Sequence, residues 1–456
     1  MTLINDPSSF RDDAGQIFNF KNKIFRSIKN DYIENYNFIK NQNIYQKLIN
    51  KNLLINSWEA KDQDLISQNF DDVNKFLEHE KLENWTYPYE WTFSQLKKAA
   101  IFHLDFQLFL LEKNISLKDA SAYNIQFKNN KPIFIDILSL QKLDKNTPWQ
   151  GHKQFCEEFL NPLVFSSYFN LPFNEIYKGN LNGISNRQII NLLGYKIFFS
   201  FSLLINVYFT ESLSSKSGIS KKKKERSYKQ SQYFLINNLK KFIKKLKYKK
   251  NKSTWSDYSN THSYSKESEI EKENILKSYI SKNKPYSLID IGCNDGKYSF
   301  LAKELGVKKV IALDYDMQCL EKIELDNNDI VTPLYADLSN ISPSIGWDNK
   351  EKKSFIERFN FDFSLSFAVV HHLAISKNIP LYEVLNFIIK LSKKGLIEFI
   401  PNDDEMVKRM KMFKTKAYDD YNLENFLKIL NENCNTVKVH ELKGSKRKIV
   451  YYEKSA

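Results

Sequence analysis

Cysteine is scarce in this chain, with four residues among 456, at positions 156, 293, 319 and 434. No two of them have C-x-x-C spacing, so the sequence predicts neither a zinc site nor a disulfide framework. The first residues, MTLINDPSSFRDD, contain no basic segment followed by an apolar one, so we expect no secretory signal. Together these absences favour a reducing, cytoplasmic location.

Glycine is also sparse, with 12 residues in the whole chain, and no G-x-G-x-x-G motif occurs. That motif forms the pyrophosphate-binding loop of nicotinamide dinucleotide folds and a similar phosphate loop in protein kinases. Its absence argues against a nicotinamide dinucleotide enzyme, and it leaves any kinase-like domain without its usual loop.

Only one hydrophobic run is long enough to be considered as a membrane span. This run, LLGYKIFFSFSLLINVYF at residues 192–209, is interrupted by Lys196, Ser200, Ser202 and Asn206. We therefore predict that it forms an inward-facing helix of a helical lobe rather than a span.

Acidic residues are outnumbered, with 54 Asp and Glu against 68 Lys and Arg, which gives a formal charge of +14. The excess favours an anionic partner, but Lys, Asn and Ile are frequent throughout, so charge alone defines no function. The length predicts two domains. We place them at residues 1–213 and 265–456, with a basic linker at 214–264.

The stretch SLIDIGCNDGK, residues 287–297, carries the strongest functional signal. An apolar run of strand length at 288–291 leads into a turn bracketed by Gly292 and Gly296, and helical spacing follows from Lys297. Glycine tolerates positive φ and carries no side chain, and a helix N-terminus presents unpaired N–H groups. The segment therefore predicts a close approach of backbone to a ligand.

Polar residues follow the next predicted strands, which span residues 309–313, 330–335 and 363–370. Asp314 follows the first of these, about twenty residues beyond the turn, where nucleotide-binding folds place a carboxylate for ribose hydroxyls. Asp337 follows the second strand, and His371 and His372 follow the third.

From about Ser265 to the C-terminus this order resembles the class I S-adenosylmethionine-dependent methyltransferases. The resemblance implies an α/β fold with a Rossmann-like seven-stranded sheet. It also implies that the segment D-x-G-x-x-x-G, here Asp290, Gly292 and Gly296, wraps the methionine half of S-adenosylmethionine. The seventh strand would belong to an antiparallel terminal hairpin, predicted at residues 436–442 and 448–452.

The same resemblance assigns roles to other residues of the predicted site. Asp314 would hold the ribose and Asp337 would contact the adenine amino group, while Cys293 and Asn294 complete the cofactor loop. Asn294 replaces the family's usual middle glycine, and we expect it to adopt a left-handed backbone. We also predict helices at 297–304, 347–358, 381–391 and 421–430, a fifth strand at 395–400, and a first helix beginning at the capping residue Ser268.

Methyl transfer from a sulfonium mainly requires in-line positioning, with a base added when the acceptor is a hydroxyl. His371 or His372 is the candidate base, and Glu398 and Asp403 are further candidates. The alternative is that one histidine stacks beside adenine or packs in the core.

In the N-terminal half, apolar and polar residues alternate at 12–28, and this pattern predicts short antiparallel strands joined by tight turns. Helical spacing follows at 36–54 and at 94–113, where we expect His103 to be a packed residue rather than a ligand. Residues 73–80 and 85–91 suggest a strand pair or a connector. His152 and Cys156 share a helix face at 150–177, and we expect them to pack rather than to bind a metal.

Between these helices, Asp119 and Asn124 stand in a loop, and Asp136 follows a predicted strand at 132–135. Protein kinases use this order: one acid orients the acceptor hydroxyl, and Asn and Asp hold magnesium on the phosphates. This half therefore resembles a degenerate α+β protein-kinase-like fold, which would bind Mg-ATP if active. Leu117 stands where kinases have His. The alternative, which we favour on sequence alone, is that these residues are loop caps and a strand-end acid.

Residues 214–252 carry fifteen Lys or Arg against a single acid, and their second part, 234–248, predicts a basic amphipathic helix. Three interpretations remain open: a solvated linker, an arm that contacts nucleic acid, or a surface helix that makes peripheral contact with an anionic membrane. The linker is favoured. No RNA-binding signature accompanies the segment, which argues against a nucleic-acid partner.

Over nearly the whole chain the order of DASAYN, FIDILS, GHKQFCEEFLNP, DIGCNDGKYS and VVHHLAI resembles the NoeA-like nodulation methyltransferases. The resemblance implies a small-molecule or glycan acceptor, such as a surface glycan or lipo-oligosaccharide. A bifunctional kinase and methyltransferase, or a methyltransferase-like binding protein without turnover, are the alternatives. The sequence indicates no oligomeric state.

Overall fold

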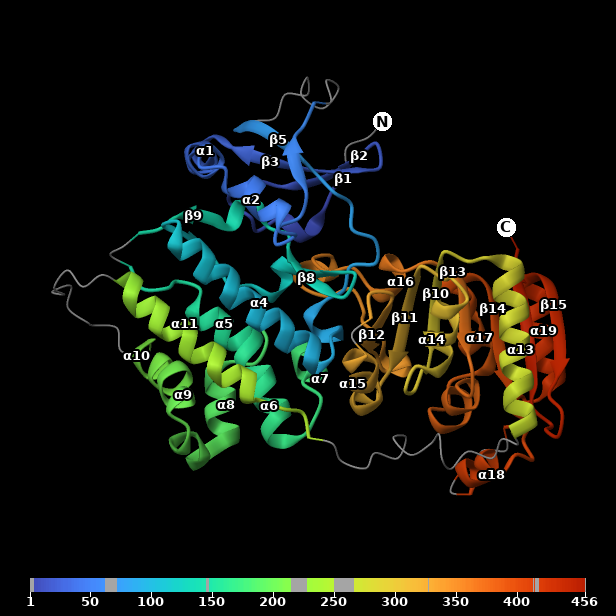
Figure 1. Cartoon of the computed structure of the whole chain (residues 1–456). Helices are drawn as coiled ribbons and strands as arrows, with labels where there is room; N and C mark the ends of the chain where they lie inside the picture. Colours follow the sequence, from blue (N-terminus) through green and yellow to red (C-terminus); the bar gives the residue numbers. More distant parts are fainter. Residues whose placement is uncertain are drawn as a thin grey trace. The chain divides into compact units, whose positions relative to one another are not determined.

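The computed structural model describes residues 4–61, 72–144, 147–214, 228–249, 266–326, 328–412, 414 and 418–455. Its contacts divide the chain into two units (Figure 1): Met1–Lys249 with Ser344–Lys353, and Lys250–Pro343 with Ser354–Ala456. Most of the stretch predicted as a linker, 215–227 and 250–264, lies outside the described residues. No helix within the described ranges is long and apolar enough to cross a membrane.

The N-terminal unit opens with a five-stranded sheet in the order β1-β2-β3-β5-β4. Two further pairs, β6 with β9 and β7 with β8, follow in sequence. Their bounds are β1 Ile4–Asn5, β2 Ile17–Phe20, β3 Lys23–Lys29, β4 Ser57–Glu59, β5 Val73–His79, β6 Ile115–Leu117, β7 Ile125–Lys128, β8 Lys131–Phe134 and β9 Leu140–Lys142. This confirms the small antiparallel sheet predicted from residues 12–28.

The β2–β3 hairpin shows why that prediction holds. Lys21 and Asn22 form its two-residue turn, with φ of 49° and 61°, and positive φ at both positions is what a tight hairpin turn requires. Phe18, Phe20 and Phe25 then share one face of the sheet and pack with Phe76 of β5.

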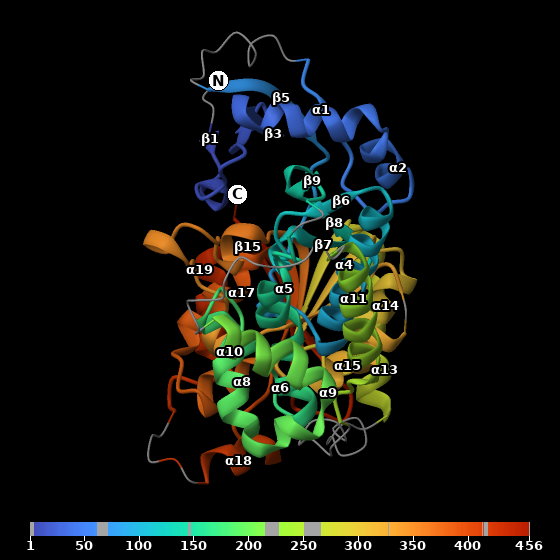
Figure 2. The ribbon, with the colours of Figure 1, turned by 90° about the vertical axis from the view of Figure 1, so that its left-hand side faces the viewer.

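Helices dominate the rest of the unit, and Figures 1 and 2 both place α8, α9 and α10 at the end away from the five-stranded sheet. The helices are α1 Ile33–Asn41, α2 Ile44–Asn50, α4 Phe93–Glu112, α5 His152–Phe155, η6 Cys156–Leu160, α6 Asn161–Phe169, α7 Asn174–Gly179, α8 Asn186–Leu193, η7 Gly194–Phe199, α9 Phe201–Leu203, η8 Leu204–Phe209, α10 Thr210–Ser214 and α11 Tyr228–Lys245.

Helix α4 is the central helix of this unit, and its start is specified by sequence. Thr92 Oγ1 accepts a hydrogen bond from the Gln95 N–H, and Gln95 Oε1 accepts one from the Thr92 N–H, which forms a capping box. His103 lies on its buried face among aromatic rings, and burial lowers its pKa to about 3. His103 is thus a packed residue, as predicted.

Of the two interpretations of residues 85–91, the connector holds: they contain a 3₁₀ turn at Pro88–Glu90 and do not pair with β5. One prediction for this unit is corrected. The run 192–209 is not one inward-facing helix: Gly194 has a φ of 54° and Ser200 is extended, so the chain breaks into η7, α9 and η8. Several of its aromatic side chains are exposed.

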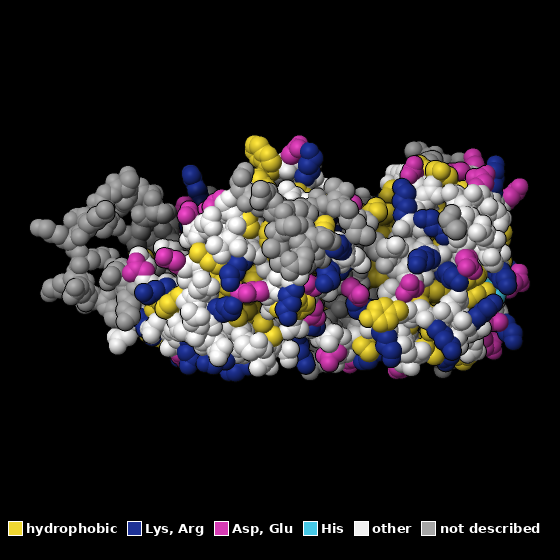
Figure 3. Space-filling model, turned by 90° about the horizontal axis from the view of Figure 1, so that it is seen from above, with side chains coloured by type: hydrophobic (Ala, Val, Ile, Leu, Met, Phe, Trp, Pro, Cys, Tyr) yellow, Lys and Arg dark blue, Asp and Glu magenta, His cyan; other side chains and the backbone are white. Residues whose placement is uncertain are grey.

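Surface charge is dispersed on the face seen in Figure 3, where Lys and Arg side chains lie among Asp and Glu. The formal charge of +14 therefore forms no single continuous basic patch on this face. Such a patch is the expected electrostatic footprint of a nucleic-acid-binding surface.

The C-terminal unit contains a seven-stranded sheet in the order β12-β11-β10-β13-β14-β16-β15. The first five strands are mutually parallel, and β16 pairs antiparallel with both β14 and β15. Their bounds are β10 Ser287–Ile291, β11 Lys309–Asp314, β12 Val331–Tyr335, β13 Phe361–Ser366, β14 Ser392–Phe399, β15 Cys434–Glu441 and β16 Lys448–Lys454. The predicted seven-stranded α/β fold is confirmed.

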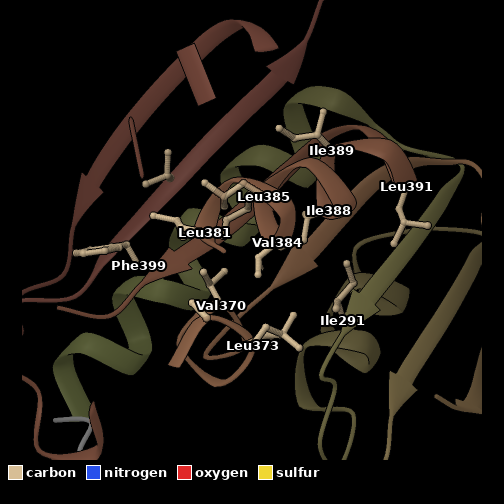
Figure 4. Close-up of a cluster of buried hydrophobic side chains, with 14 of the residues drawn as sticks. Ile291, Val370, Leu373, Leu381, Val384, Leu385, Ile388, Ile389, Leu391 and Phe399 are labelled. Carbon is tan, nitrogen blue, oxygen red and sulfur yellow. The ribbon is translucent and has the colours of Figure 1, made fainter. Parts of the chain in front are cut away.

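Helices α14 and α15 pack against β10–β12, and α17 packs against β13 and β14. The helices are α13 Lys266–Asn283, α14 Lys297–Glu304, α15 Met317–Leu325, α16 Phe355–Arg358, η11 His372–Ser376, α17 Leu381–Leu391, α18 Glu405–Lys411 and α19 Leu423–Asn433. Figure 4 shows a buried apolar cluster of this unit, where Leu385 and Ile388 of α17 lie close to Val370 and Ile291.

Two boundary predictions were wrong. Residues 347–358 are not one helix, because Asp348 and Asn349 have a φ of 55° and Ser354 caps a separate helix, α16. Ser268 does not begin the first helix, since α13 includes Lys266 and Ser268 is buried within it.

The α17 core gives a stability prediction. Leu385 is fully buried, so Leu385→Ala should lower the free energy of unfolding of the C-terminal unit by about 2–5 kcal/mol. Tyr382 on the same helix is half exposed, and Tyr382→Ala should cost much less. Urea denaturation followed by circular dichroism measures both. Equal losses in the two variants would contradict this description of the core.

Candidate functional site

A cavity of about 390 Å³ lies at the carboxyl ends of β10–β13 in the C-terminal unit. Parallel α/β sheets bind ligands at this edge, beside the point where the strand order reverses. Here the order reverses at β10, between β11 and β13. Of the residues singled out in the sequence, those that line the cavity are Asp290, Gly292, Cys293, Asn294, Asp314, Asp337 and His372. Gly296 and His371 are not in its wall.

The turn after β10 can be built only with glycine at its first position. Gly292 has a φ of 73°, and a Cβ there would lie 2.4 Å from Val369 Cγ2. Gly296 has a φ of 84° and would meet Ile323 at 2.8 Å. Asn294 adopts a φ of 50°, which is the left-handed backbone expected from the sequence. The turn thus packs against the Val369 side chain, which follows β13, with no room for a side chain on Gly292.

Asp314 lies at the end of β11 and faces the turn. Its carboxylate accepts backbone hydrogen bonds from Asn294 and Asp316, both at 2.9 Å. Burial raises its pKa to about 6, and the two N–H donors oppose that rise. Each carboxylate oxygen keeps a second lone pair, so the group can also accept hydrogen bonds from ligand hydroxyls.

Asp337 follows β12 and is more exposed. Its carboxylate accepts hydrogen bonds from the Ser339 N–H and hydroxyl, at 2.8 and 2.6 Å, and Lys377 lies 3.6 Å away. Burial raises its pKa, but the Ser339 hydrogen bonds and the Lys377 charge outweigh that effect and hold it below its ordinary value. Asp337 is therefore ionised near neutral pH.

The two histidines occupy different environments. His372 contributes to the cavity wall, and burial lowers its pKa to about 4. His371 is buried beneath it, with ring centroids 4.1 Å apart, and burial lowers its pKa well below the ordinary value. Both are neutral near pH 7. Of the two, His372 is the one that a ligand in the cavity can reach.

Of the further acid candidates, Asp403 is exposed and forms an ion pair with Lys446. Glu398 is fully buried, and it accepts a hydrogen bond from the Ala368 N–H at 3.0 Å. Neither residue forms part of the cavity wall.

Lys272 of α13 also lines the cavity, although the sequence did not single it out. Its Nζ lies 2.7 Å from Glu398 Oε2 and over the Phe367 ring, and it lines the cavity although it is buried. Burial lowers the pKa of Lys272, and Glu398 opposes this effect. A sequence signal existed, because Lys272 stands midway between the buried residues Ser268 and Leu276 at helical i, i+4 spacing.

These features fit S-adenosylmethionine. The cavity volume falls in the range of about 300–1,000 Å³ typical of small-molecule sites. The turn at Gly292 leaves its backbone open to a ligand, and the acids at 314 and 337 follow adjacent strands on the same edge of the sheet.

A second polar cluster lies in the N-terminal unit. Asn124 Nδ2 donates to Asp119 Oδ1 at 3.0 Å and lies 3.5 Å from Asp136 Oδ2, while the Ser139 hydroxyl donates to Asp119 at 3.0 Å. The fold thus brings together the three residues that the sequence singled out. Burial and the neighbouring Asp136 raise the pKa of Asp119 to about 6.

Arg26 of β3 completes this cluster and was also missed. Its guanidinium is buried, donates to Asp136 Oδ1 at 2.7 Å and forms an ion pair with Asp12. The cation lies on a central strand of the sheet, but it is Arg, whereas protein kinases have a lysine on a strand at this stage of the fold. Burial lowers its pKa, whereas Asp136 and Asp12 outweigh that effect and raise it.

His152 and Cys156 pack as predicted. Cys156 Sγ lies 3.7 Å from His152 Nε2, and both side chains also contact Asn206. No group of three or more His, Cys, Asp or Glu residues that would hold a metal occurs in the described parts of the chain.

The strand order, the antiparallel seventh strand and the cavity with its glycine turn define the C-terminal unit as a class I S-adenosylmethionine-dependent methyltransferase. No model of a protein family matches the chain. The chain is 35% identical over 460 residues to the nodulation protein NoeA of Rhizobium meliloti (strain 1021), an alignment covering 98% of this chain and 95% of that protein. The chain therefore belongs to the NoeA family.

Solved structures resemble parts of the chain. The N-methyltransferase NodS from Bradyrhizobium japonicum WM9 is 13% identical, with 41% of this chain and 88% of that chain covered at a TM-score of 0.30. WbdD is 10% identical, with 43% of each chain covered at a TM-score of 0.30. Because these scores are low, the fold assignment rests on the strand order and site of the chain itself.

The raised pKa of Asp290 gives a pH prediction. Its carboxylate is buried and accepts a 2.6 Å hydrogen bond from the Ser299 hydroxyl, and burial raises its pKa from 3.8 to about 6. The folded state thus holds this proton more tightly than the unfolded chain. The protonated carboxyl group of Asp290 therefore contributes its full stabilisation of the fold below pH 3.8, and this stabilisation is lost as the pH rises through about 6.

Asp290→Asn removes the ionisation but keeps an oxygen that can accept from Ser299. The variant should be more stable than the wild type near pH 7, by up to about 3 kcal/mol, and should show little gain near pH 4. Urea denaturation at the two pH values measures the difference, with the exposed Asp326→Asn as the control. A gain of the same size at both pH values would rule out the assigned cause.

Proposed function

We propose that the C-terminal unit transfers a methyl group from S-adenosylmethionine to an acceptor. The observation that supports this most directly is the meeting of the Gly292 turn, Asp314 and Asp337 in one cavity. The cofactor supplies a methyl group already activated on a sulfonium, so the chain has mainly to bind and orient the reactants.

Different residues along the carboxyl edge of the sheet bind different parts of the cofactor. Asp314 accepts hydrogen bonds from the ribose hydroxyls, and the ionised Asp337 accepts one from the adenine amino group. The Gly292 turn faces the methionine part, beside Tyr298 and Phe367, which stack edge to face with centroids 4.9 Å apart. This order follows the strands from β12 through β11 to β10.

His372 is the proposed acceptor-side base. Its imidazole is neutral at physiological pH and so has a lone pair that can accept a proton from an acceptor hydroxyl, while burial, which lowers its pKa to about 4, makes it a weaker base than a free histidine. Glu398 is less suited to this role, because its carboxylate already binds the Lys272 ammonium and the Ala368 N–H.

The acceptor we propose is a glycan or a lipo-oligosaccharide. Support comes from the NoeA relative, which is named a nodulation protein. The aromatic wall formed by Tyr298 and Phe367 would also give a sugar ring an apolar surface to lie on.

Calorimetric titration of the full chain with S-adenosylmethionine tests the cofactor assignment. Wild type should bind, and Asp314→Ala should weaken binding at least about tenfold, since a charge-assisted hydrogen bond contributes about 1.5–3 kcal/mol. Gly292→Val should abolish binding, because even its Cβ would meet Val369. Asp326→Ala, an exposed acid in the same unit, is the matched control and should bind like wild type.

Absence of binding by the folded wild-type protein would refute the assignment. Binding by Asp314→Ala at wild-type affinity would remove that residue from the ribose site. Binding without turnover on any glycan tested would favour a binding protein that retains the methyltransferase fold.

A second candidate function belongs to the N-terminal unit, and the convergence of Asp119, Asn124 and Asp136 favours it. We propose that this cluster binds Mg-ATP. Its two carboxylates and one amide oxygen are donors of the kind that Mg²⁺ prefers. Arg26 neutralises part of the negative charge but occupies only one Asp136 oxygen, Oδ1.

Magnesium-dependent ATP binding to the full chain is the corresponding measurement. Asn124→Ala should weaken it at least about tenfold without disturbing the Arg26 ion pairs. Asp136→Asn should weaken it at least as much, and it also removes the ion pair between Asp136 and Arg26. The exposed Asp31→Asn should leave it unchanged. If the wild-type protein binds ATP equally well with magnesium or with a chelator, the metal role of the cluster is wrong.

A further inference from the structure

The broken hydrophobic run at 192–209 exposes an unusual number of large apolar side chains. Phe199 is 83% exposed, Tyr195 71% and Phe201 64%, and three neighbours are about half exposed: Leu192, Phe198 and Phe209. Single exposed apolar residues are normal on protein surfaces, but a contiguous cluster marks an interaction site. We call this cluster, together with Phe234 of α11, the aromatic surface.

Ring contacts join neighbouring members of the aromatic surface in two groups. Tyr195 and Phe199 contact each other along η7 with centroids 6.3 Å apart. Phe198 contacts Tyr208 at 5.4 Å, and Tyr208 contacts Phe209 at 5.7 Å, which joins η7 to η8. The breaks at Gly194 and Ser200 therefore turn these rings outward on neighbouring short helices.

Helix α11 extends the aromatic surface and adds positive charge. Its Asn238 Oδ1 accepts a 2.8 Å hydrogen bond from the Ser202 hydroxyl of α9. Phe234, Lys241 and Lys245 share that face at helical i, i+3 and i, i+4 spacing, and all three are exposed. Apolar rings and lysine side chains thus lie side by side.

The local charge balance is strongly positive. Lys196, Lys241, Lys244 and Lys245 are exposed, whereas two nearby acids are already paired: Asp105 with Lys240 and Glu211 with Lys153. An anionic ligand would therefore meet little repulsion at this surface.

The combination of exposed rings and lysines selects among possible occupants. A symmetric contact with a second copy would bring the lysines of both copies together, and like charges across an interface are costly. A single-stranded nucleic acid would need a charged groove that tracks its backbone. An anionic bilayer matches both components, since aromatic rings enter the interfacial layer and lysines reach the lipid phosphates.

We propose that the N-terminal unit docks on the surface of an anionic membrane through the aromatic surface and the lysines of α11. The contact is peripheral: the rings of η7 and α9 insert among the headgroups, and Lys241, Lys244 and Lys245 pair with lipid phosphates. This proposal concerns a surface of the N-terminal unit and is independent of the methyl-transfer assignment.

Co-sedimentation of the full chain with vesicles tests the proposal. Vesicles of phosphatidylcholine mixed with phosphatidylserine should bind the protein, and binding should fall as salt is added. Vesicles of phosphatidylcholine alone should bind it at least about tenfold more weakly.

Two variants separate the two components. A triple variant with Phe198→Ser, Phe199→Ser and Phe201→Ser should lose binding at least about tenfold, since little apolar area remains to insert. A second triple variant carries Lys241→Gln, Lys244→Gln and Lys245→Gln. Its binding to anionic vesicles should also be at least about tenfold weaker and should depend much less on salt. Circular dichroism and thermal unfolding of the same preparations check that the variants are folded.

Matched controls come from the C-terminal unit. Leu325→Ser, Tyr382→Ser and Met412→Ser replace three exposed apolar residues elsewhere. Lys308→Gln, Lys428→Gln and Lys438→Gln remove the same net charge at exposed positions. Both control sets should bind vesicles like wild type.

Failure of the wild-type chain to bind anionic vesicles would overturn the proposal, as would equal losses in the control sets. If the wild-type chain instead forms a concentration-dependent dimer that the aromatic variant abolishes, the surface is an interface between copies. A salt-sensitive shift with RNA in place of vesicle binding would assign it to nucleic acid.

Discussion

The methyltransferase site depends on one close contact, where the turn after β10 packs against the side chain of Val369, beyond the end of β13. Only hydrogen is small enough for the side-chain position of Gly292, because a Cβ would lie within 2.4 Å of Val369. The approach is held by the N–H groups of Gly292 and Cys293, both of which donate to the Leu313 carbonyl. These hydrogen bonds hold the turn at the end of β11, where the Asp314 carboxylate accepts a further hydrogen bond from the Asn294 N–H. The absence of a side chain at Gly292 thus allows the turn to lie between Val369 and the end of β11.

The strands and helices of this unit were predicted well because they are specified by patterns among residues close in sequence. Apolar runs of strand length, separated by amphipathic helices, specify a parallel sheet, and the acids that follow those strands necessarily meet at its carboxyl edge. The helix boundaries of α14 and α17 agree with the sequence because periodicity and turn residues coincide there. The helix predicted at 347–358 failed because Asp348 and Asn349 adopt positive φ, which residue pattern alone does not reveal.

The residues that sequence reasoning missed are charged groups buried by tertiary contacts. Lys272 and Glu398 are 126 positions apart, and Arg26 and Asp136 are 110 apart, so no local pattern pairs them. Each lysine or arginine resembles an ordinary surface residue until its partner is known. A buried charge without its partner costs several kcal/mol, so such pairs specify how distant segments must meet. The rings at 192–209 are a different case. Their apolar sequence is typical of a core helix, and it is the breaks at Gly194 and Ser200 that place them on the surface.

The two raised carboxyl pKa values in the cavity couple ligand binding to protons. Asp290 and Asp314 both titrate near 6, because burial disfavours their charged forms. Ribose hydroxyls that donate to Asp314 stabilise its ionised form and so lower its pKa. Occupation of the site would therefore release a fraction of a proton when the pH lies near 6. The heat of binding then contains a buffer ionisation component, and the affinity rises as the pH rises through about 6.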